Sequence, residues 1–193
     1  MSLETILEQY PVDLELKGGF GCQLRPLETE DESAFFEFFQ QVPMEERLFI
    51  KHRIEDREVI HHWCANIDYD AKMPLLAVQE NAVIGAATLH QQMGGWRRHI
   101  GRVSVLVLPQ YRGRGLARRM VAEITELAQH AGLDFVEAEF IGKQEAAIKM
   151  FGLLGFGPLF TLPDYVRDME GTTHDYTVLS MPLKIDEEYA GMG

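Results

Sequence analysis

A glycine-rich turn flanked by arginines is the segment of the chain whose residue types and spacing could do chemistry. It lies between an apolar strand that begins at Val103 and an amphipathic helix that continues to Ala122 and beyond. The first amides of a helix have no intrahelical acceptor and carry partial positive charge from the helix dipole, so they can bind a pyrophosphate. Gly113 and Gly115 let its oxygens approach closely because they have no Cβ. Cationic side chains surround the same turn, namely Arg112, Arg114, Arg118 and Arg119.

Two common nucleotide-binding motifs fit this turn poorly. A P-loop requires a lysine directly after its last glycine, and no lysine follows Gly113 or Gly115. A dinucleotide-binding turn requires a third small residue and an acidic residue about twenty positions later. Glu137 and Glu139 lie near that distance, but two glycines alone are weak support for such a turn. A protein that uses the turn for another nucleotide diphosphate is therefore the least favoured interpretation.

A second motif further along the chain narrows the interpretation. The pattern Arg112-x-x-Gly115-x-Ala117 follows a Val-x-Val-x-Pro strand, and Ala146-Ala-Ile-x-x-Phe-x-x-Leu-Gly-Phe156 lies downstream of it. In order and spacing the two segments closely resemble the GNAT superfamily of N-acyltransferases. The resemblance is strong from Pro74 to Leu183, looser from Leu24 to Trp63, and leaves out the N-terminal arm.

The resemblance implies where a coenzyme would bind. In the superfamily the turn after the fourth strand holds the pyrophosphate of acyl-coenzyme A, and the fourth and fifth strands splay apart to admit the pantetheine arm. Carried over, backbone groups of Val105, Leu106 and Val107 would contact that arm. Gln144 stands where the family tends to place an asparagine, and its amide could hydrogen-bond the pantetheine. The diphosphate would be cradled by six consecutive residues, Arg112, Gly113, Arg114, Gly115, Leu116 and Ala117.

Acyl transfer from a thioester to an amine needs a base for the amine and a backbone N–H for the oxyanion, and neither needs a metal. Glu139 is the preferred base, because strand alternation places it on one face with Glu137. The alternative is that both are solvated strand carboxylates without a role. The splayed strand near Leu106 or Val107 could supply the N–H.

The departing thiolate also needs a proton. Many members of the superfamily supply it from a tyrosine on the last helix, but this chain has Phe151 at that position. Either the thiolate leaves without an acid, or another hydroxyl such as that of Tyr165 reaches the site, or catalysis is weak. Residues 162–171 look like the segment that joins the last strands in GNAT enzymes, where such loops usually cover the acceptor. Its Asp164, Tyr165 and Asp168 could bind a cationic acceptor, and a solvated turn is the alternative.

Composition limits the remaining possibilities. The chain has 193 residues, 46% of them hydrophobic, enough for one sizeable core. A net charge of −12 argues against nucleic-acid binding, and an acidic surface would suit a cationic amine or serve as a solubility coat. No apolar run approaches the about 20 residues that span a bilayer, and the acidic start is unlike a signal peptide. We expect a cytoplasmic protein in which Cys22 and Cys64 are free thiols.

The hydrophobic pattern predicts a mixed α/β (α+β) fold. Its periodicity gives alternating strands and helices only. The resemblance implies a GNAT-like, mostly antiparallel central sheet with splayed strands and with helices on both faces. We expect an N-terminal arm at 1–16, a single domain at 17–185 and a flexible tail at 186–193.

The favoured function is an N-acyltransferase that moves an acetyl group from acetyl-CoA to a primary amine by direct attack. The acceptor would be a small molecule or a protein amine. The alternative is a catalytically weak acyl-CoA-binding sensor, which the absence of an obvious acid and base would suit. Dimers are frequent in the superfamily, and the apolar arm could bury against a second copy, although nothing in the sequence requires a homodimer.

Overall fold

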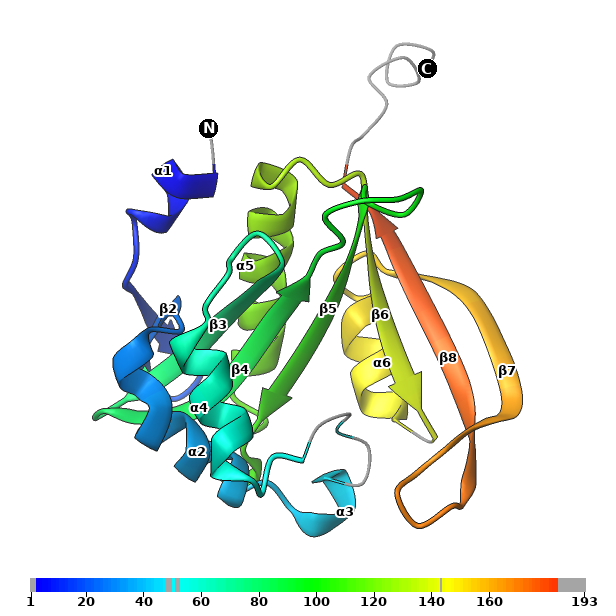
Figure 1. Ribbon diagram of the computed structural model, residues 1–193, viewed down its shortest axis with the longest axis horizontal. Helices are drawn as coiled ribbons and strands as arrows, with labels where there is room; N and C mark the ends of the chain where they lie inside the picture. Colours follow the sequence, from blue (N-terminus) through cyan, green and yellow to red (C-terminus); the bar gives the residue numbers. More distant parts are fainter. Residues whose placement is uncertain (1–2, 48–49, 51–52, 143, 184–193) are drawn as a thin grey trace.

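A mixed eight-stranded sheet forms the centre of the molecule (Figure 1). The computed structural model describes residues 3–47, 50, 53–142 and 144–183. The strands lie in the order β1-β2-β3-β4-β5-β6-β8-β7; β5 and β6 run parallel, and the other neighbours run antiparallel. Their bounds are Val12–Leu16 (β1), Phe20–Pro26 (β2), Lys72–Gln79 (β3), Ala82–His90 (β4), Ile100–Val107 (β5), Phe135–Ile141 (β6), Gly157–Arg167 (β7) and Thr173–Pro182 (β8).

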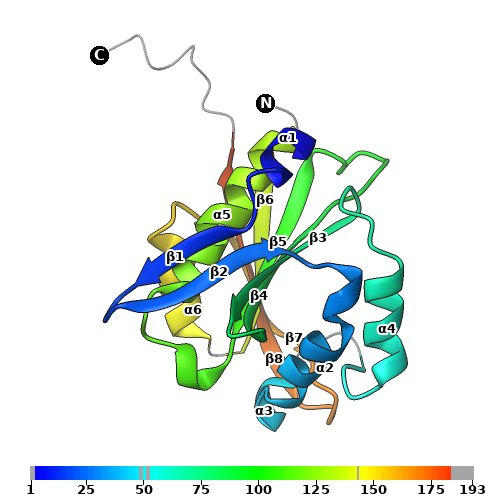
Figure 2. The same cartoon turned by 90° about the vertical axis from the view of Figure 1, so that its left-hand side faces the viewer.

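Helices cover both faces of this sheet (Figures 1 and 2). The pair α5 and α6 packs on one face, and α2 and α4 pack on the other. The predicted mostly antiparallel sheet with helices on both faces is therefore confirmed. The helices are α1 (Leu3–Leu7), α2 (Glu32–Gln40), α3 (Met44–Arg47), α4 (Arg57–Ala65), α5 (Leu116–His130) and α6 (Glu145–Gly152), with 3-10 turns at Thr29–Asp31 and Pro109–Tyr111.

Each face of the sheet has its own hydrophobic core. Beneath α5, Met120, Val121 and Ile124 are buried at helical spacing against the sheet. On the opposite face Phe35 and Phe39 of α2 contact each other with ring centroids 4.8 Å apart. Apolar burial on both sides fixes the strands that carry the site.

The parallel strands β5 and β6 separate along their length. They pair only over Ile100–Arg102 and Phe135–Glu137. Beyond Arg102, β5 stays paired with β4, whereas β6 stays paired with β8. Figure 1 shows the two strands diverging from one end. This confirms the splay that the family resemblance implied.

The N-terminal arm packs on the same body. Strand β1 pairs with β2, and the Tyr10 hydroxyl donates to Glu123 of α5 at 3.0 Å. The division at residues 16 and 185 stays a prediction, and the tail at 186–193 lies outside the described residues. No helix in the described part of the chain is long and apolar enough to span a membrane.

Strand β7 corrects one expectation. Residues 162–171 were expected to form a loop, but β7 extends to Arg167 and pairs with β8. The strand is exposed on both faces along most of its length, so no apolar alternation marks it in the sequence. Its pairing is irregular between Leu162 and Val166, where Asp164 adopts a φ of 50°.

Candidate active site

A cavity of about 920 Å³ opens where β5 and β6 part. Its volume is in the range of about 300–1,000 Å³ that is typical of ligand pockets. One wall consists of β5 and the start of α6, and the other consists of α2, α4 and the residues just after α4. The predicted coenzyme residues that line the cavity are Val105, Leu106, Val107, Arg112, Ala117 and Gln144.

The backbone of β5 turns free donors toward the gap. Leu108 N–H donates to the Ile84 carbonyl at 3.1 Å, and the register of β4 with β5 has no shift. Because N–H directions alternate along an antiparallel ladder, the N–H groups of Val105 and Val107 point away from β4 and toward the parted strand. The gap therefore contains backbone donors suited to a pantetheine arm or an oxyanion.

The glycine turn has the backbone geometry of an anion site. Gly113 and Gly115 have φ values of 77° and 89°, in the left-handed region that favours glycine. Gly115 caps α5 without a side-chain hydrogen bond. Within the described residues, no acceptor is found for the backbone N–H groups of residues 113–118. A Cβ built on either glycine would meet nothing within 4 Å, so the space in front of the turn is open.

Three of the four arginines around the turn contact other residues of the protein. Arg112 donates from Nε to the Val107 carbonyl at 2.8 Å and from both terminal nitrogens to Glu46 of α3 at 2.7 and 2.8 Å. Arg114 lies over the Phe20 ring, 4.6 Å from its centroid. Arg119 pairs with Glu123 at 2.9 Å.

Other predicted coenzyme residues play different parts. Leu116 is buried in the core and anchors the start of α5. Gln144 lines the cavity, and its Oε1 accepts the Ile141 N–H at 3.1 Å at the end of β6. Gly113, Arg114 and Gly115 lie outside the cavity lining, so a role for them rests on the open turn alone.

The two carboxylates of β6 share a face, as strand alternation predicted, but their surroundings differ. Glu139 lines the cavity, with Oε1 3.4 Å from Arg102. Tyr176 of β8 hydrogen-bonds the Glu139 carboxylate, and burial together with this carboxylate raises the pKa of Tyr176 to about 12. Glu137 pairs with Arg97 at 2.5 Å and is outside the cavity lining.

Phe151 of α6 cannot donate a proton to the thiolate, because its phenyl ring has no acidic hydrogen. Phe151 is buried between Phe140 and Phe156, whose ring centroids lie 5.2 and 4.9 Å away. Tyr165 is 66% exposed, stacks on Tyr176 at 6.1 Å and does not line the cavity. Its role as an acid stays a prediction.

Sequence reasoning missed the polar residues on the floor of the cavity. Strand register aligns three rows of side chains across β3, β4 and β5. One row is apolar, the next carries hydroxyls and the third carries basic groups. The apolar row consists of Leu76, Ala86 and Leu106. The row with hydroxyls consists of Pro74, Thr88 and Ser104, and the basic row consists of Lys72, His90 and Arg102. Alternation of Arg102, Ser104 and Leu106 was the available signal, but only the register shows what lies beside them.

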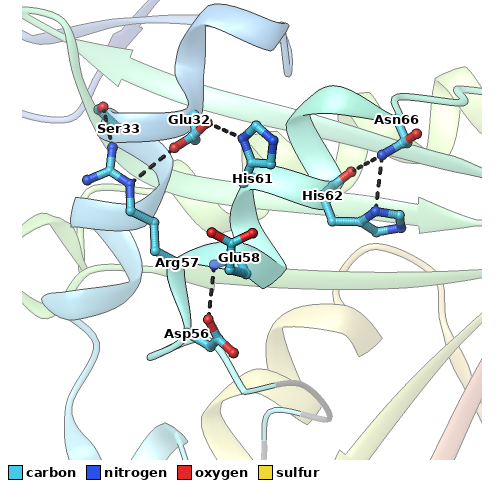
Figure 3. Close-up of polar contacts among 8 residues, drawn as sticks. All are labelled: Glu32, Ser33, Asp56, Arg57, Glu58, His61, His62 and Asn66. Atoms are coloured by element: carbon cyan, nitrogen blue, oxygen red, sulfur yellow. Dashed lines mark hydrogen bonds and ion pairs between the residues drawn. The ribbon is translucent and has the colours of Figure 1, made fainter.

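A polar cluster holds α4 against α2 (Figure 3). Glu32 accepts from Arg57 Nε at 3.1 Å and contacts His61 Nδ1 at 2.7 Å. This contact raises the pKa of His61 and lowers that of Glu32. One turn later, Asn66 Nδ2 donates to the His62 carbonyl at 2.9 Å. The cluster positions the cavity-facing end of α4.

The sequence model of the acetyltransferase (GNAT) family matches residues 27–156. The chain belongs to this family. It is similar to the L-amino acid N-acyltransferase MnaT of Escherichia coli K12, with 30% identity over 122 residues, 61% of this chain and 67% of the relative.

Solved structures agree with this GNAT fold. The ribosomal-protein-S5-alanine acetyltransferase of Vibrio fischeri superposes with a TM-score of 0.75 at 19% identity, covering 92% of this chain and 98% of the other. Salmonella typhimurium yncA, solved with its cofactor acetyl-CoA, superposes with a TM-score of 0.72 at 20% identity. The match covers 85% of this chain and 95% of the other. Family membership confirms the interpretation of the chain as an N-acetyltransferase.

Proposed function

We propose that this GNAT acetyltransferase binds acetyl-CoA with its diphosphate on the turn before α5 and its pantetheine arm between β5 and β6. The observation that carries the proposal is the parting of these strands beside the start of α5, where no side chain caps the helix. A homologous fold was solved with acetyl-CoA as its cofactor, which supports the choice of coenzyme. The cavity involves β5 and α6 together with α2 and α4, so one space could hold both the thioester and an acceptor.

The reaction we propose is direct attack by a primary amine. Glu139 removes a proton from the bound ammonium, directly or through one water, and the neutral nitrogen attacks the thioester carbon. The N–H of Val107, which ladder alternation turns toward the gap, would stabilise the oxyanion. Collapse of the tetrahedral intermediate breaks the C–S bond, and the nitrogen releases its second proton to solvent as the neutral amide forms. The thiolate then takes a proton from solvent or from a hydroxyl, for which Tyr165 stays a candidate.

Acceptors of two kinds are known from the names of similar proteins. The Escherichia coli relative is an acyltransferase of L-amino acids, and the Vibrio fischeri protein is named for a ribosomal-protein alanine. We therefore propose an amino acid or a protein amine as the acceptor. A homodimer stays a prediction.

Calorimetry with acetyl-CoA and CoA, followed by thiol release against an amine library, tests the proposal. We expect saturable binding and amine-dependent thiol release. Absence of binding at millimolar coenzyme would contradict it. Displacement of acetyl-CoA by ATP or NAD at lower concentration would instead favour a nucleotide site.

A further inference from the structure

Lys72 places an ammonium group on the wall of the cavity. It is partly buried at the start of β3, and its ammonium lies 3.9 Å from the centroid of the Trp63 ring. Both residues line the cavity. Among the residues that the structure describes, no carboxylate lies within 4.0 Å of this ammonium.

Three of the acidic residues that line the cavity have other partners. Asp68, four residues before Lys72, accepts the N–H groups of Asp70 and Ala71 at 3.1 and 3.3 Å. Glu139 pairs with Arg102, and Glu46 pairs with Arg112. Burial lowers the pKa of Lys72, and no neighbouring anion opposes that shift. A partly desolvated ammonium is costly unless it is paired, so an anion that enters the cavity would be stabilised there.

Lys72 lies near the β5 segment beside which the amine is proposed to meet the thioester. Strand register aligns it with His90 and Arg102 in the basic row. The adjacent row contains the hydroxyls of Thr88 and Ser104. It lies two residues along each strand from the basic row, which is a separation of about 7 Å. Ser104 precedes the β5 segment whose N–H groups face the gap. An acceptor whose amine meets the thioester beside this segment would thus have its other polar group near the basic row.

Another part of the cavity lining is apolar. It consists of aromatic and aliphatic side chains from α2, α4 and the adjoining segments, including Leu27, Phe35, Phe39, Trp63 and Ile67. These side chains suit an apolar substituent on the acceptor.

We propose that the acceptor is a small apolar amino acid and that Lys72 binds its carboxylate. This proposal rests on the transferase function proposed above. This inference narrows the proposed acceptors, an amino acid or a protein amine, to an amino acid. A protein N-terminus lacks a free carboxylate next to its amine, so it would not meet Lys72 in this way.

Matched acids and amides test the inference. Thiol release from acetyl-CoA is measured with L-leucine, L-methionine and L-phenylalanine and with their primary amides. The amine of the amide is less basic, so a larger share is neutral and chemistry alone favours the amide. We nevertheless expect kcat/KM to favour at least one acid by about tenfold, since hydrogen bonds to charged groups are stronger than neutral ones.

Lys72→Met is the diagnostic variant. It should lower kcat/KM for the favoured acid by about tenfold or more and leave its amide within about twofold. Lys72→Arg should restore part of the preference. The melting temperature of Lys72→Met should be unchanged or higher, because the variant removes a partly desolvated charge. Lys149→Met, at an exposed lysine of α6 outside the cavity lining, is the control and should change neither rate.

A binding measurement separates the two proposals. Calorimetry compares N-acetyl-L-leucine with N-acetyl-L-leucinamide, with and without CoA. Thiol release without any preference for acids would overturn the inference and leave the transferase proposal standing. Lys72-dependent binding of the acid, without thiol release from acetyl-CoA in the presence of any amine, would support the role of Lys72 and overturn the transferase proposal. Equal losses for acid and amide in Lys72→Met, or no acid bound or acetylated, would overturn the role of Lys72.

Discussion

Arg112 and Glu46 form a bidentate ion pair that joins the glycine turn before α5 to α3. The two pairs of atoms lie 2.7 and 2.8 Å apart, and both side chains line the cavity. Glu46 thus places a carboxylate beside the turn proposed to bind a diphosphate. A phosphate oxygen and this carboxylate would compete for the same guanidinium.

Removing this carboxylate should strengthen coenzyme binding. We expect Glu46→Gln to tighten acetyl-CoA binding by about two- to fivefold, the scale of a partly exposed ion pair. Calorimetry measures the change. Glu45→Gln makes the same change in net charge on the neighbouring residue, for which no ion pair is described, and should have a smaller effect. Weaker binding in Glu46→Gln would mean that Glu46 orients Arg112 for the coenzyme.

Two substitutions at Gly115 separate the effect of an added charge on coenzyme binding from the effect of backbone strain. Gly115→Asp and Gly115→Asn both place a side chain at a φ of 89°, which costs about 1–2 kcal/mol for a non-glycine residue. Only aspartate adds a negative charge where the diphosphate is proposed to bind. We expect Gly115→Asp to weaken acetyl-CoA binding by at least about tenfold more than Gly115→Asn. Equal affinities of the two variants would place the diphosphate elsewhere.

Glu139 and Glu137 offer a matched test of the base. Both lie on one face of β6 and both pair with an arginine, but only Glu139 lines the cavity. Glu139→Gln should lower kcat/KM by about 100-fold, the lower range for loss of a general base. Glu137→Gln should change kcat/KM much less. Similar losses in steady-state assays of the two variants would rule out a specific role for Glu139.

The contact between Glu32 and His61 should make the α2–α4 junction sensitive to pH. Folding raises the pKa of His61 above 6.5, so protonated His61 stabilises the folded protein below pH 6.5. That contribution is lost as the pH rises through the folded-state pKa. Folding lowers the pKa of Glu32 below 4.5, so its contribution is lost as the pH falls through that lower value.

Nuclear magnetic resonance can follow this titration directly. Glu32→Gln should return the pKa of His61 toward 6.5, because Glu32 is the main cause of the shift. Glu58→Gln should have a smaller effect, since Glu58 contributes less. In denaturant unfolding, His61→Gln should lose stability at about pH 5.5 but not at about pH 8.5. An unshifted His61 in the wild-type protein would contradict the contact.

Local features of the chain were predictable because they depend on neighbouring residues. The glycines and arginines around the start of α5 predict an anion-binding turn, and Gly113 and Gly115 do adopt positive φ. Apolar spacing located α5, and alternation placed Glu137 and Glu139 on one face. Strand β7 escaped prediction because it is exposed on both faces and therefore shows no such pattern.

By itself the sequence determined the family, the sheet with its covering helices, and the turn proposed to hold a diphosphate. Only the tertiary structure decided which groups share the cavity. Lys72, His90 and Arg102 come from three strands, and Arg112 meets Glu46 across 66 positions of sequence. The physical reason is that strand register and helix docking are set by burial of the whole core, which no local pattern of residues encodes.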